Sequence, residues 1–410
     1  PGYPSGQFSF SRGVTCKDRF SCPSDEGNGF AAMLIGWATG GSFHIDPKAF
    51  TRSGYWGFYF QDDWKISRKL TINLGIRYEF DEPMWEKFNR ESYWDLQAQS
   101  PVKVEGYETR GVYRFVNDEH RSPFKGDYNN WSPRVGLAYA PTSKLAIRAG
   151  YALLYQLSRN TVHGHTGSGF QVNSSPVFTR DSNATLYARL SNPYPDGMLL
   201  PPGNSLGEWT FIGLGASTIN PDWGDNPEYH TWSLSIQYQL PFQSLLEANY
   251  TGTRGTNLML PYNSLTPLHP MYWSIGRSQL TSHVPNPFYG IITDPKSQLS
   301  RPTVQLFRLL RPMPHFDGAS GNYSMPPAAD SYYHALQIKW EKRYSHGLTL
   351  LAHYTFSKMI DTASHGSGNL NWLGGGTSFQ DPLNLRLERA LSAHDVKHRG
   401  VITFAWEVPV

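Results

Sequence analysis

Long stretches of strictly alternating apolar and polar residues recur along this chain. Successive side chains of a strand point to opposite faces, so such a stretch predicts a strand with one apolar and one polar face. Residues 55–65 and residues 70–81 both alternate in this way, and the polar break at 66–68 between them predicts a hairpin turn. The clearest alternation sets Leu70, Ile72, Leu74, Ile76, Tyr78 and Phe80 against Thr71, Asn73, Gly75, Arg77, Glu79 and Asp81.

Three more hairpins with the same alternation follow, and then a single last strand. Breaks at 141–143, 241–243 and 345–347 predict their turns, and the last strand passes through Ile402 and Trp406. Before the first hairpin, the chain offers a short strand candidate, GQFSFS, and an apolar patch, FAAMLIGW, that fits a short helix or a strand.

The connections alternate as regularly as the strands do. Turns of about three residues are followed by polar segments of several tens of residues, at 82–129, 157–227, 255–330 and 360–397, which we interpret as long loops. Loops beyond ~15 residues are uncommon in compact domains, whereas outer-membrane barrels combine short periplasmic turns with long extracellular loops. The pattern predicts an all-β, antiparallel transmembrane β-barrel, present in part as about ten strands. A soluble β-sandwich, whose strands also alternate, is the alternative.

Aromatic residues near the predicted strand ends favour the barrel, because Trp and Tyr concentrate at the two membrane interfaces. They include Trp56, Trp64, Tyr78, Trp131, Tyr155, Trp232, Tyr250, Trp340 and Tyr354. Aromatic residues make up 14% of the 410 residues and charged residues 17%. The 36 Lys and Arg nearly balance the 33 Asp and Glu, so the composition gives no sign of nucleic-acid binding.

The two cysteines, Cys16 and Cys22, lie close together in a segment rich in Gly, Ser and Asp. We predict a local disulfide formed in an oxidising compartment. A zinc site would need further ligands, and the neighbouring sequence offers none. The sequence has no recognisable signal peptide, and both ends look cut from a longer protein.

Residue types that could support catalysis occur, but in weak arrangements. Asp62 and Asp63 end a strand and are expected at the lumen or the periplasmic rim, and the loop pair His163 and His165 lacks a nearby carboxylate. The group at 394–399, with two His, an Asp and an Arg, is expected to form hydrogen bonds at the barrel rim. Nucleophile elbows, Walker loops and dinucleotide fingerprints are not found in the sequence. We predict no enzymatic activity, metal site or cofactor.

Aromatic residues in the long loops are the candidate ligand-binding residues. Exposed aromatic rings can stack on sugars or hold peptides, and binding residues concentrate on loops over a rigid scaffold. The same rings could equally pack the loops against one another. The candidates are Trp94, Trp209, Trp223, Trp273 and Trp372, with Tyr272 beside them.

Five blocks, in order, resemble the barrel of TonB-dependent outer-membrane receptors, particularly the Oar-like group that carries a carboxypeptidase-regulatory-like domain. They are YFQDDWKISRKLTINLGIRYE, NWSPRVGLAYAPTSKLAIRAGYALLY, NPEYHTWSLSIQYQLPFQSLLEANYTGTRGTNL, SYYHALQIKWEKRYSHGLTLLAHYTFSKMID and SAHDVKHRGVITFAWEVP. Ala152 departs from the second block, where a glycine is common. Together the blocks cover nearly all of the chain.

The resemblance implies a barrel of about 22 strands in the bacterial outer membrane, closed by a plug and energised through the TonB complex. Residues 1–410 would then be part of one barrel domain, without the plug, the TonB box and the last strands. The implied function is energised uptake of a bulky ligand: an oligosaccharide, a peptide or a chelated metal. The expected partners are outer-membrane lipid and the TonB complex, reached through the missing N-terminal region. Alternatives are a passive porin, an outer-membrane adhesion or assembly scaffold, and a secreted soluble carbohydrate-binding protein.

Overall fold

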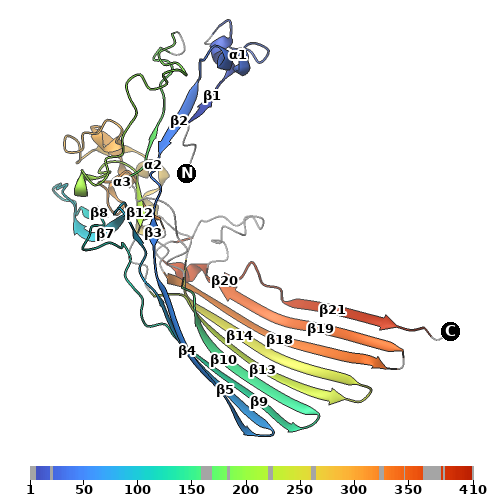
Figure 1. Cartoon of the computed structure of the whole chain (residues 1–410). Coiled ribbons are helices and arrows are strands. Elements are labelled where there is room, and N and C mark those ends of the chain that lie inside the picture. The colour runs from blue at the N-terminus through green and yellow to red at the C-terminus, as the bar shows by residue number, and fades with distance from the viewer. Residues whose placement is uncertain are drawn as a thin grey trace.

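An antiparallel sheet of ten strands, which we call the wall, is the main element of the structure (Figure 1). The structure is a computed structural model and describes residues 6–18, 22–157, 169–181, 185–219, 225–259, 265–322, 327–345, 347–362, 380–381 and 384–408. The wall consists of β4 (Tyr55–Ser67), β5 (Leu70–Asp81), β9 (Trp131–Thr142), β10 (Leu145–Tyr155), β13 (Glu228–Leu240), β14 (Ser244–Met259), β18 (Pro327–Ser345), β19 (Leu348–Asp361), β20 (Ala390–Leu391) and β21 (His398–Trp406).

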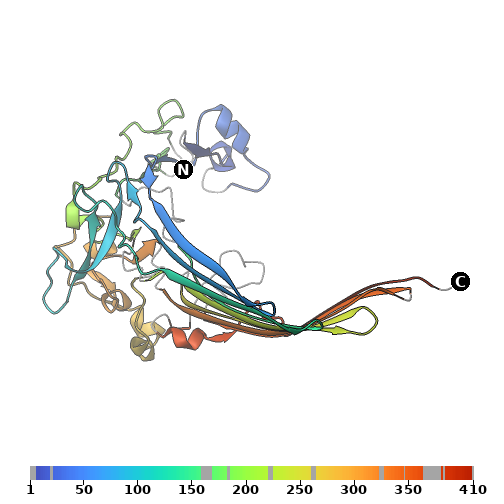
Figure 2. The same ribbon diagram turned by 60° about the horizontal axis from the view of Figure 1, so that its bottom comes forward.

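From β4 to β19, each strand of the wall pairs with the next wall strand in the sequence, and β20 and β21 both pair with β19. The two edges are therefore β4 on one side and β20 with β21 on the other. The described strands form an open, curved wall rather than a closed barrel (Figure 2). This confirms the predicted fold class, an antiparallel and partial barrel of about ten strands.

The strand register keeps the two faces of the wall chemically distinct. One row of paired residues runs across the sheet through Ile147, Ile236, Ala248, Ile338 and Tyr354. The adjacent row lies on the opposite face and carries Arg148, Ser235, Asn249, Gln337 and Thr355. A shift of one residue would exchange the two faces, so the alternation in the sequence specifies the register.

The short turns lie together at one end of the wall, as the alternation predicted (Figure 1). The first turn is tighter than expected, because β4 continues to Ser67 and β5 begins at Leu70. Between β13 and β14, Phe242 and Gln243 have left-handed φ angles of 57° and 56°, the backbone conformation that tight hairpin turns use.

The long connections are not structureless, which corrects the interpretation of 82–129, 157–227 and 255–330 as plain loops. Strands from all three form a second sheet in the order β17–β12–β7–β8. Its strands are β7 (Ser92–Gln99), β8 (Arg110–Phe115), β12 (Ala216–Ile219) and β17 (Ala319–Asn322). The third connection adds β15 (His283–Pro285), β16 (Thr303–Gln305), α2 (Arg277–Leu280) and α3 (Leu306–Leu309). Because β12 pairs in parallel with strands from distant connections, a hairpin pattern in the sequence could not reveal this sheet.

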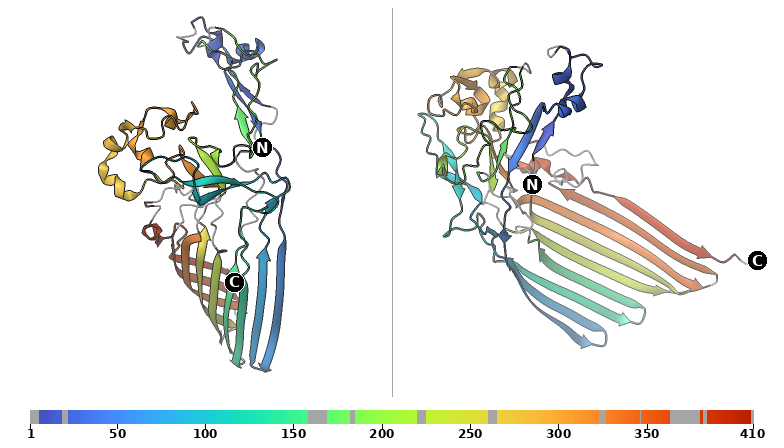
Figure 3. Two further views of the ribbon diagram at one scale, coloured as in Figure 1. Left: turned by 90° about the vertical axis from the view of Figure 1, so that its left-hand side faces the viewer. Right: turned by 45° about the horizontal axis from the view of Figure 1, so that its top comes forward.

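These segments share one buried hydrophobic core, and we call them together the loop body. It lies at the end of the wall opposite the short turns (Figure 3). Aromatic rings pack at the centre of the core, where Trp94 lies 4.6 Å from Tyr113 and 5.1 Å from Phe316, measured between ring centroids. The core residues are Trp94, Val102, Tyr113, Ile212, Ala216, Phe288, Ile292, Leu299, Val304, Leu309, Phe316 and Ala319.

A smaller unit precedes the wall and takes one strand from the second connection. Its sheet has the order β1 (Gln7–Ser9), β2 (Gly40–Ile45) and β11 (Val172–Ser174), so the predicted first strand is present. The apolar patch FAAMLIGW forms a short helix, α1 (Gly29–Leu34). The helix begins after Asn28, whose side chain accepts hydrogen bonds from the backbone N–H groups of Phe30 and Ala31.

Candidate functional site

Side-chain hydrogen bonds join neighbouring strands along the polar face of the wall. Such a face can present donors and acceptors to a polar ligand, whereas the opposite face cannot. The pairs between strands are Arg148 with Gln237 at 2.8 Å, Ser235 with Glu247 at 2.9 Å and Asn249 with Gln337 at 3.2 Å. Within β18, Lys339 forms an ion pair with Glu341 at 2.9 Å.

A cleft of about 510 Å³ lies on this face near the short turns. Its lining includes the charged side chains of Lys144, Glu341 and Arg343 and the amides of Gln237 and Gln239. The cleft is therefore polar and of mixed charge, and it lies at the end of the wall opposite the loop body.

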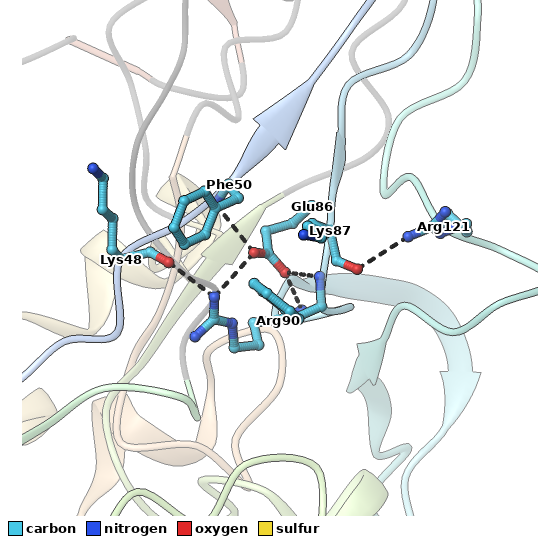
Figure 4. A network of polar contacts seen from close by, with 7 residues as sticks. Lys48, Phe50, Glu86, Lys87, Arg90 and Arg121 are labelled. Atoms are coloured by element: carbon cyan, nitrogen blue, oxygen red, sulfur yellow. Dashed lines mark hydrogen bonds and ion pairs between the residues drawn. The ribbon is translucent and has the colours of Figure 1, made fainter.

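The segment that enters β4 is tied to the first long connection through Glu86. Its carboxylate accepts hydrogen bonds from the backbone N–H groups of Phe50 (3.1 Å), Phe88 (2.7 Å) and Arg90 (3.0 Å), and from the Arg90 guanidinium (3.2 Å). Arg90 also donates to the carbonyl oxygen of Lys48 at 2.8 Å. Figure 4 shows these contacts around the fully buried Glu86. They fix where the loop body joins the wall.

Two neighbouring buried carboxyl groups are driven to opposite protonation states at this junction. Burial raises the pKa of Glu86, but the N–H donors and Arg90 outweigh it, so the pKa of Glu86 is lowered overall. Burial, and then the negative charge of Glu86, raise the pKa of Glu91 to about 8. At neutral pH, Glu86 is therefore ionised and Glu91 protonated.

A buried histidine holds the loop body together at another point. His315 is fully buried, and its Nε2 lies 2.9 Å from the carbonyl oxygen of Gly111 in β8. Burial lowers the pKa of His315 to about 4, although the bond to Gly111 opposes this shift. The imidazole is therefore neutral at physiological pH and acts as a structural cross-link between two connections.

The candidate aromatic residues divide into different environments. Trp94 is completely buried in the core of the loop body, so it packs the loops and is not available to a ligand from outside. Trp209 and Trp273 are 50% and 52% exposed on short 3-10 helices, Gly207–Trp209 and Pro270–Ile275. Trp223 and Trp372 lie outside the described residues.

The remaining residues singled out from the sequence have structural surroundings. Cys16 and Cys22 are joined by a disulfide with a Cα–Cα distance of 5.6 Å, while His163 and His165 lie outside the described residues. Asp63 accepts a hydrogen bond from Asn73 on the polar face. Asp62 pairs with Leu74 on the apolar face, which corrects its expected lumen or rim position.

The group at 394–399 forms hydrogen bonds at the long-loop end of the wall. Asp395 accepts from the backbone N–H of Met359 at 2.6 Å, and His398 Nδ1 lies 2.8 Å from the hydroxyl of Tyr354. Among the described residues, three or more His, Cys, Asp or Glu side chains nowhere gather as a metal site requires. No described helix is both long and apolar enough to cross a membrane.

Several solved structures are similar to this chain at low scores. The alcaligin outer membrane receptor FauA from Bordetella pertussis is 11% identical, with a TM-score of 0.33 over 90% of this chain and 39% of that chain. The ferric-catecholate import receptor Fiu from E. coli K12 is 12% identical, with a TM-score of 0.30 over 76% and 29%. The FrpB iron transporter from Neisseria meningitidis is 10% identical, with a TM-score of 0.28 over 76% and 36%. This chain spans less than half the length of each.

The comparison with family models covers the whole chain. No curated protein matches the chain. The family model of the outer membrane beta barrel domain matches residues 1–410. That match agrees with the wall of antiparallel strands, its apolar and polar faces, and its alternation of short turns and long connections. The chain therefore belongs to the outer membrane beta barrel domain family and resides in the bacterial outer membrane.

Proposed function

We propose that this chain is the barrel wall and the extracellular loops of a TonB-dependent receptor that takes up a bulky ligand. The observation that carries the proposal is the convergence of three extracellular connections into one loop body with its own core. Such a body can hold binding side chains in fixed positions above a polar-faced wall. The five sequence blocks that resemble TonB-dependent receptors support energised uptake.

Residues 1–410 would form part of a single barrel domain. The edge strands β4 and β21 present backbone N–H and C=O groups that lipid cannot satisfy, and each unsatisfied group costs several kcal/mol in the bilayer. Further strands must therefore pair with these edges in the membrane. The proposal expects these strands and a plug that contacts TonB from the rest of the receptor.

The ligand class proposed is an oligosaccharide, a peptide or a chelated metal. Trp209 and Trp273 offer exposed ring faces for stacking at the extracellular side. The polar face of the wall and the cleft near Gln237 and Arg343 would then lie along the route of the ligand to the periplasm. Trp223 and Trp372 remain candidates for the same role.

Two of the alternatives share this wall. A passive porin would let small solutes through without energy, and an adhesion or assembly scaffold would import nothing. A secreted soluble carbohydrate-binding protein is excluded, because the chain belongs to an outer-membrane family.

Uptake by the full-length receptor in its native cells tests the proposal. We expect accumulation of one radiolabelled ligand class from a panel of oligosaccharides, peptides and chelated iron, and loss of this accumulation on deletion of the receptor or of TonB. Size-limited uptake that persists without TonB would instead identify a porin. A receptor deletion that changes only cell adhesion would identify a scaffold.

Ligand binding to the loops can be tested with matched tryptophan variants. We expect Trp209→Ala and Trp273→Ala to weaken ligand binding by about 5- to 150-fold, since one stacked ring contributes about 1–3 kcal/mol. Trp340→Ala, on the apolar face of β18, is the control and should leave ligand affinity unchanged. Equal affinities of all three variants and the wild type would remove these two residues from the site.

A further inference from the structure

Two arginines of the third long connection lie close together and partly buried in the loop body. Arg308 belongs to α3, which is labelled in Figure 1, and Arg311 follows shortly after the helix ends. The ring of Phe307 borders both side chains. The guanidinium carbon of Arg311 lies 4.5 Å from the ring centroid, and that of Arg308 lies 5.4 Å from it. We call Arg308 and Arg311 the arginine pair.

A single acid balances the charge of the arginine pair among the described residues. Arg308 forms an ion pair with Asp317, and the two side chains are 24% and 25% exposed. Arg311 forms no ion pair or hydrogen bond with any residue that the structure describes, and its Nε is buried without a partner. Two guanidinium groups therefore face one carboxylate, and one positive charge has no counter-charge.

Other partly buried arginines of the extracellular connections have acidic partners. The Arg90 guanidinium lies 3.2 Å from the carboxylate of the fully buried Glu86. Arg114 Nε lies 3.3 Å from the carboxylate of Asp95. The fold thus pairs its buried guanidinium groups with acids at these positions, and Arg311 departs from that rule.

A partly buried charge without a counter-charge destabilises the folded state, so Arg311 calls for an explanation outside packing. Burial, and then the positive charge of Arg308, lower the pKa of Arg311 from its ordinary value. Arginine nevertheless stays charged at neutral pH. The repulsion within the arginine pair is therefore relieved when an anion binds beside it.

The chemistry of the arginine pair selects an oxyanion. A guanidinium that stacks on a ring through its face keeps its N–H edge free, and that edge fits two oxygens of a carboxylate or a phosphate. Because Nε of Arg311 is buried, the terminal Nη atoms are the donors. A neutral sugar would leave the extra charge unbalanced, and a cationic group would be repelled.

We propose that the arginine pair binds a carboxylate or phosphate group of the transported ligand. This inference rests on the proposed uptake function and narrows its ligand class. A neutral oligosaccharide no longer fits, whereas an acidic oligosaccharide, a peptide with a free carboxylate or an anionic metal chelate does. Arg311 supplies the unbalanced charge, and Arg308, held by Asp317, adds the second cation.

Inorganic phosphate probes the site directly, with purified full-length receptor in nanodiscs at constant ionic strength. We expect phosphate to slow protease cleavage of the extracellular connections, by about 10-fold at ten times the concentration that halves the rate, because only the folded loop body binds it. Arg311→Gln should abolish this protection. The control Arg301→Gln removes the same charge from an exposed position of the same connection and should keep it. Equal protection of Arg311→Gln and wild type would overturn the proposal.

Cleavage without phosphate separates a binding role from a structural one. We expect Arg311→Gln to be at least as resistant to protease as the wild type, because the substitution removes an unbalanced buried charge. Faster cleavage of this variant would assign Arg311 a structural role and would overturn the proposal.

Paired probes connect the site to uptake. They are oligogalacturonate and its methyl ester, peptides with free and with amidated carboxyl groups, and ferric complexes of negative and of zero net charge. We expect the full-length receptor to bind the acidic member of one pair, and neutralising the probe or introducing Arg311→Gln to weaken binding at least about 10-fold, since charge-assisted hydrogen bonds are lost.

The uptake assay also distinguishes this inference from the function on which it rests. TonB-dependent uptake of a neutral probe as strong as that of its acidic counterpart would overturn the inference and leave the proposed uptake function standing. Phosphate protection without TonB-dependent uptake of any probe would keep the anion site but overturn the uptake function, and with it the assignment of the site to a transported ligand.

Discussion

The wall and the loop body bury apolar side chains in opposite ways. In the wall, large apolar residues point outward, and Phe60 and Ile402 are each 70% exposed in the protein alone. In the loop body, Trp94 and Phe288 are completely buried against residues from other connections. The wall therefore obtains its apolar environment from lipid, whereas the loop body makes its own.

The backbone shows the same contrast. In the wall, antiparallel pairing follows the order of the strands in the sequence, within each hairpin and from one hairpin to the next across a long connection. In the loop body, β12 joins β7 and β17 in parallel, across connections far apart in the chain. Changes that weaken one region should therefore leave the other folded, and the following predictions test that independence.

Removing the central side chain of the loop core should have the largest effect. We expect Trp94→Ala to destabilise the loop body by about 3–5 kcal/mol, the usual cost of deleting a fully buried tryptophan side chain. Protease added to intact cells should then cut the extracellular connections faster. The wall should keep its heat-modifiable mobility, because Trp94 makes no part of its sheet.

Trp209→Ala is the matched control, since Trp209 is half exposed in the same loop body. We expect its extracellular cleavage to stay close to that of the wild type. Loss of heat-modifiable mobility in the Trp94 variant would show that the wall depends on the loop core, and the two regions would then be one folding unit.

A charge on the lipid-facing side of the wall should have the next largest effect. Ile338 lies on the apolar face of β18 between Ala248 and Tyr354, and Gln337 lies beside it on the polar face. We expect Ile338→Arg to destabilise the barrel by about 2–4 kcal/mol, measured by urea unfolding in lipid. The control Gln337→Arg should cost less than about 1 kcal/mol. Equal costs for both variants would contradict the assignment of the faces.

The wall could be predicted from the sequence because its signal is local. Alternation with a period of two fixed the strands from Leu70 to Trp406, and the turn lengths fixed their order. Asp62 is the exception, because the period of two places it in the row of Phe60 and Trp64, whereas its acidic side chain suggested the lumen or the rim. The five sequence blocks, rather than periodicity, suggested the receptor family.

The loop body could not be predicted, because its contacts connect segments that share no pattern. Trp94 looked like any exposed loop aromatic until its packing with Tyr113 and Phe316 was known. Glu86 and Glu91 gave no signal either, since their pKa values depend on backbone N–H groups and burial that only the fold creates. The only related feature of the sequence is that Glu86 and Glu91 lie five residues apart next to short strands, and this arrangement occurs in many loops.

The protonation of Glu91 should give the loop body a pH dependence that the wall lacks. Its folded-state pKa of about 8 lies above the unfolded value, so the folded state binds more protons and stability falls as pH rises towards 8. Between pH 6.5 and 8, this amounts to roughly 2 kcal/mol. Glu86, with a lowered pKa, is ionised in both states over this range. His315, with a folded-state pKa of about 4, is neutral when folded, and loss of its proton from the unfolded state raises stability by only about 0.4 kcal/mol between pH 6.5 and 8.

The measurement is the urea midpoint of tryptophan emission from the loop body at pH 6.5, 7.2 and 8. The wild-type midpoint should fall across this range, and that of Glu91→Gln should not fall, because glutamine does not titrate. Glu119→Gln, at an exposed position in the same connection, should behave like the wild type. A constant wild-type midpoint would mean that Glu91 ionises without cost, and the buried carboxyl pair would then not distinguish the loop body from the wall.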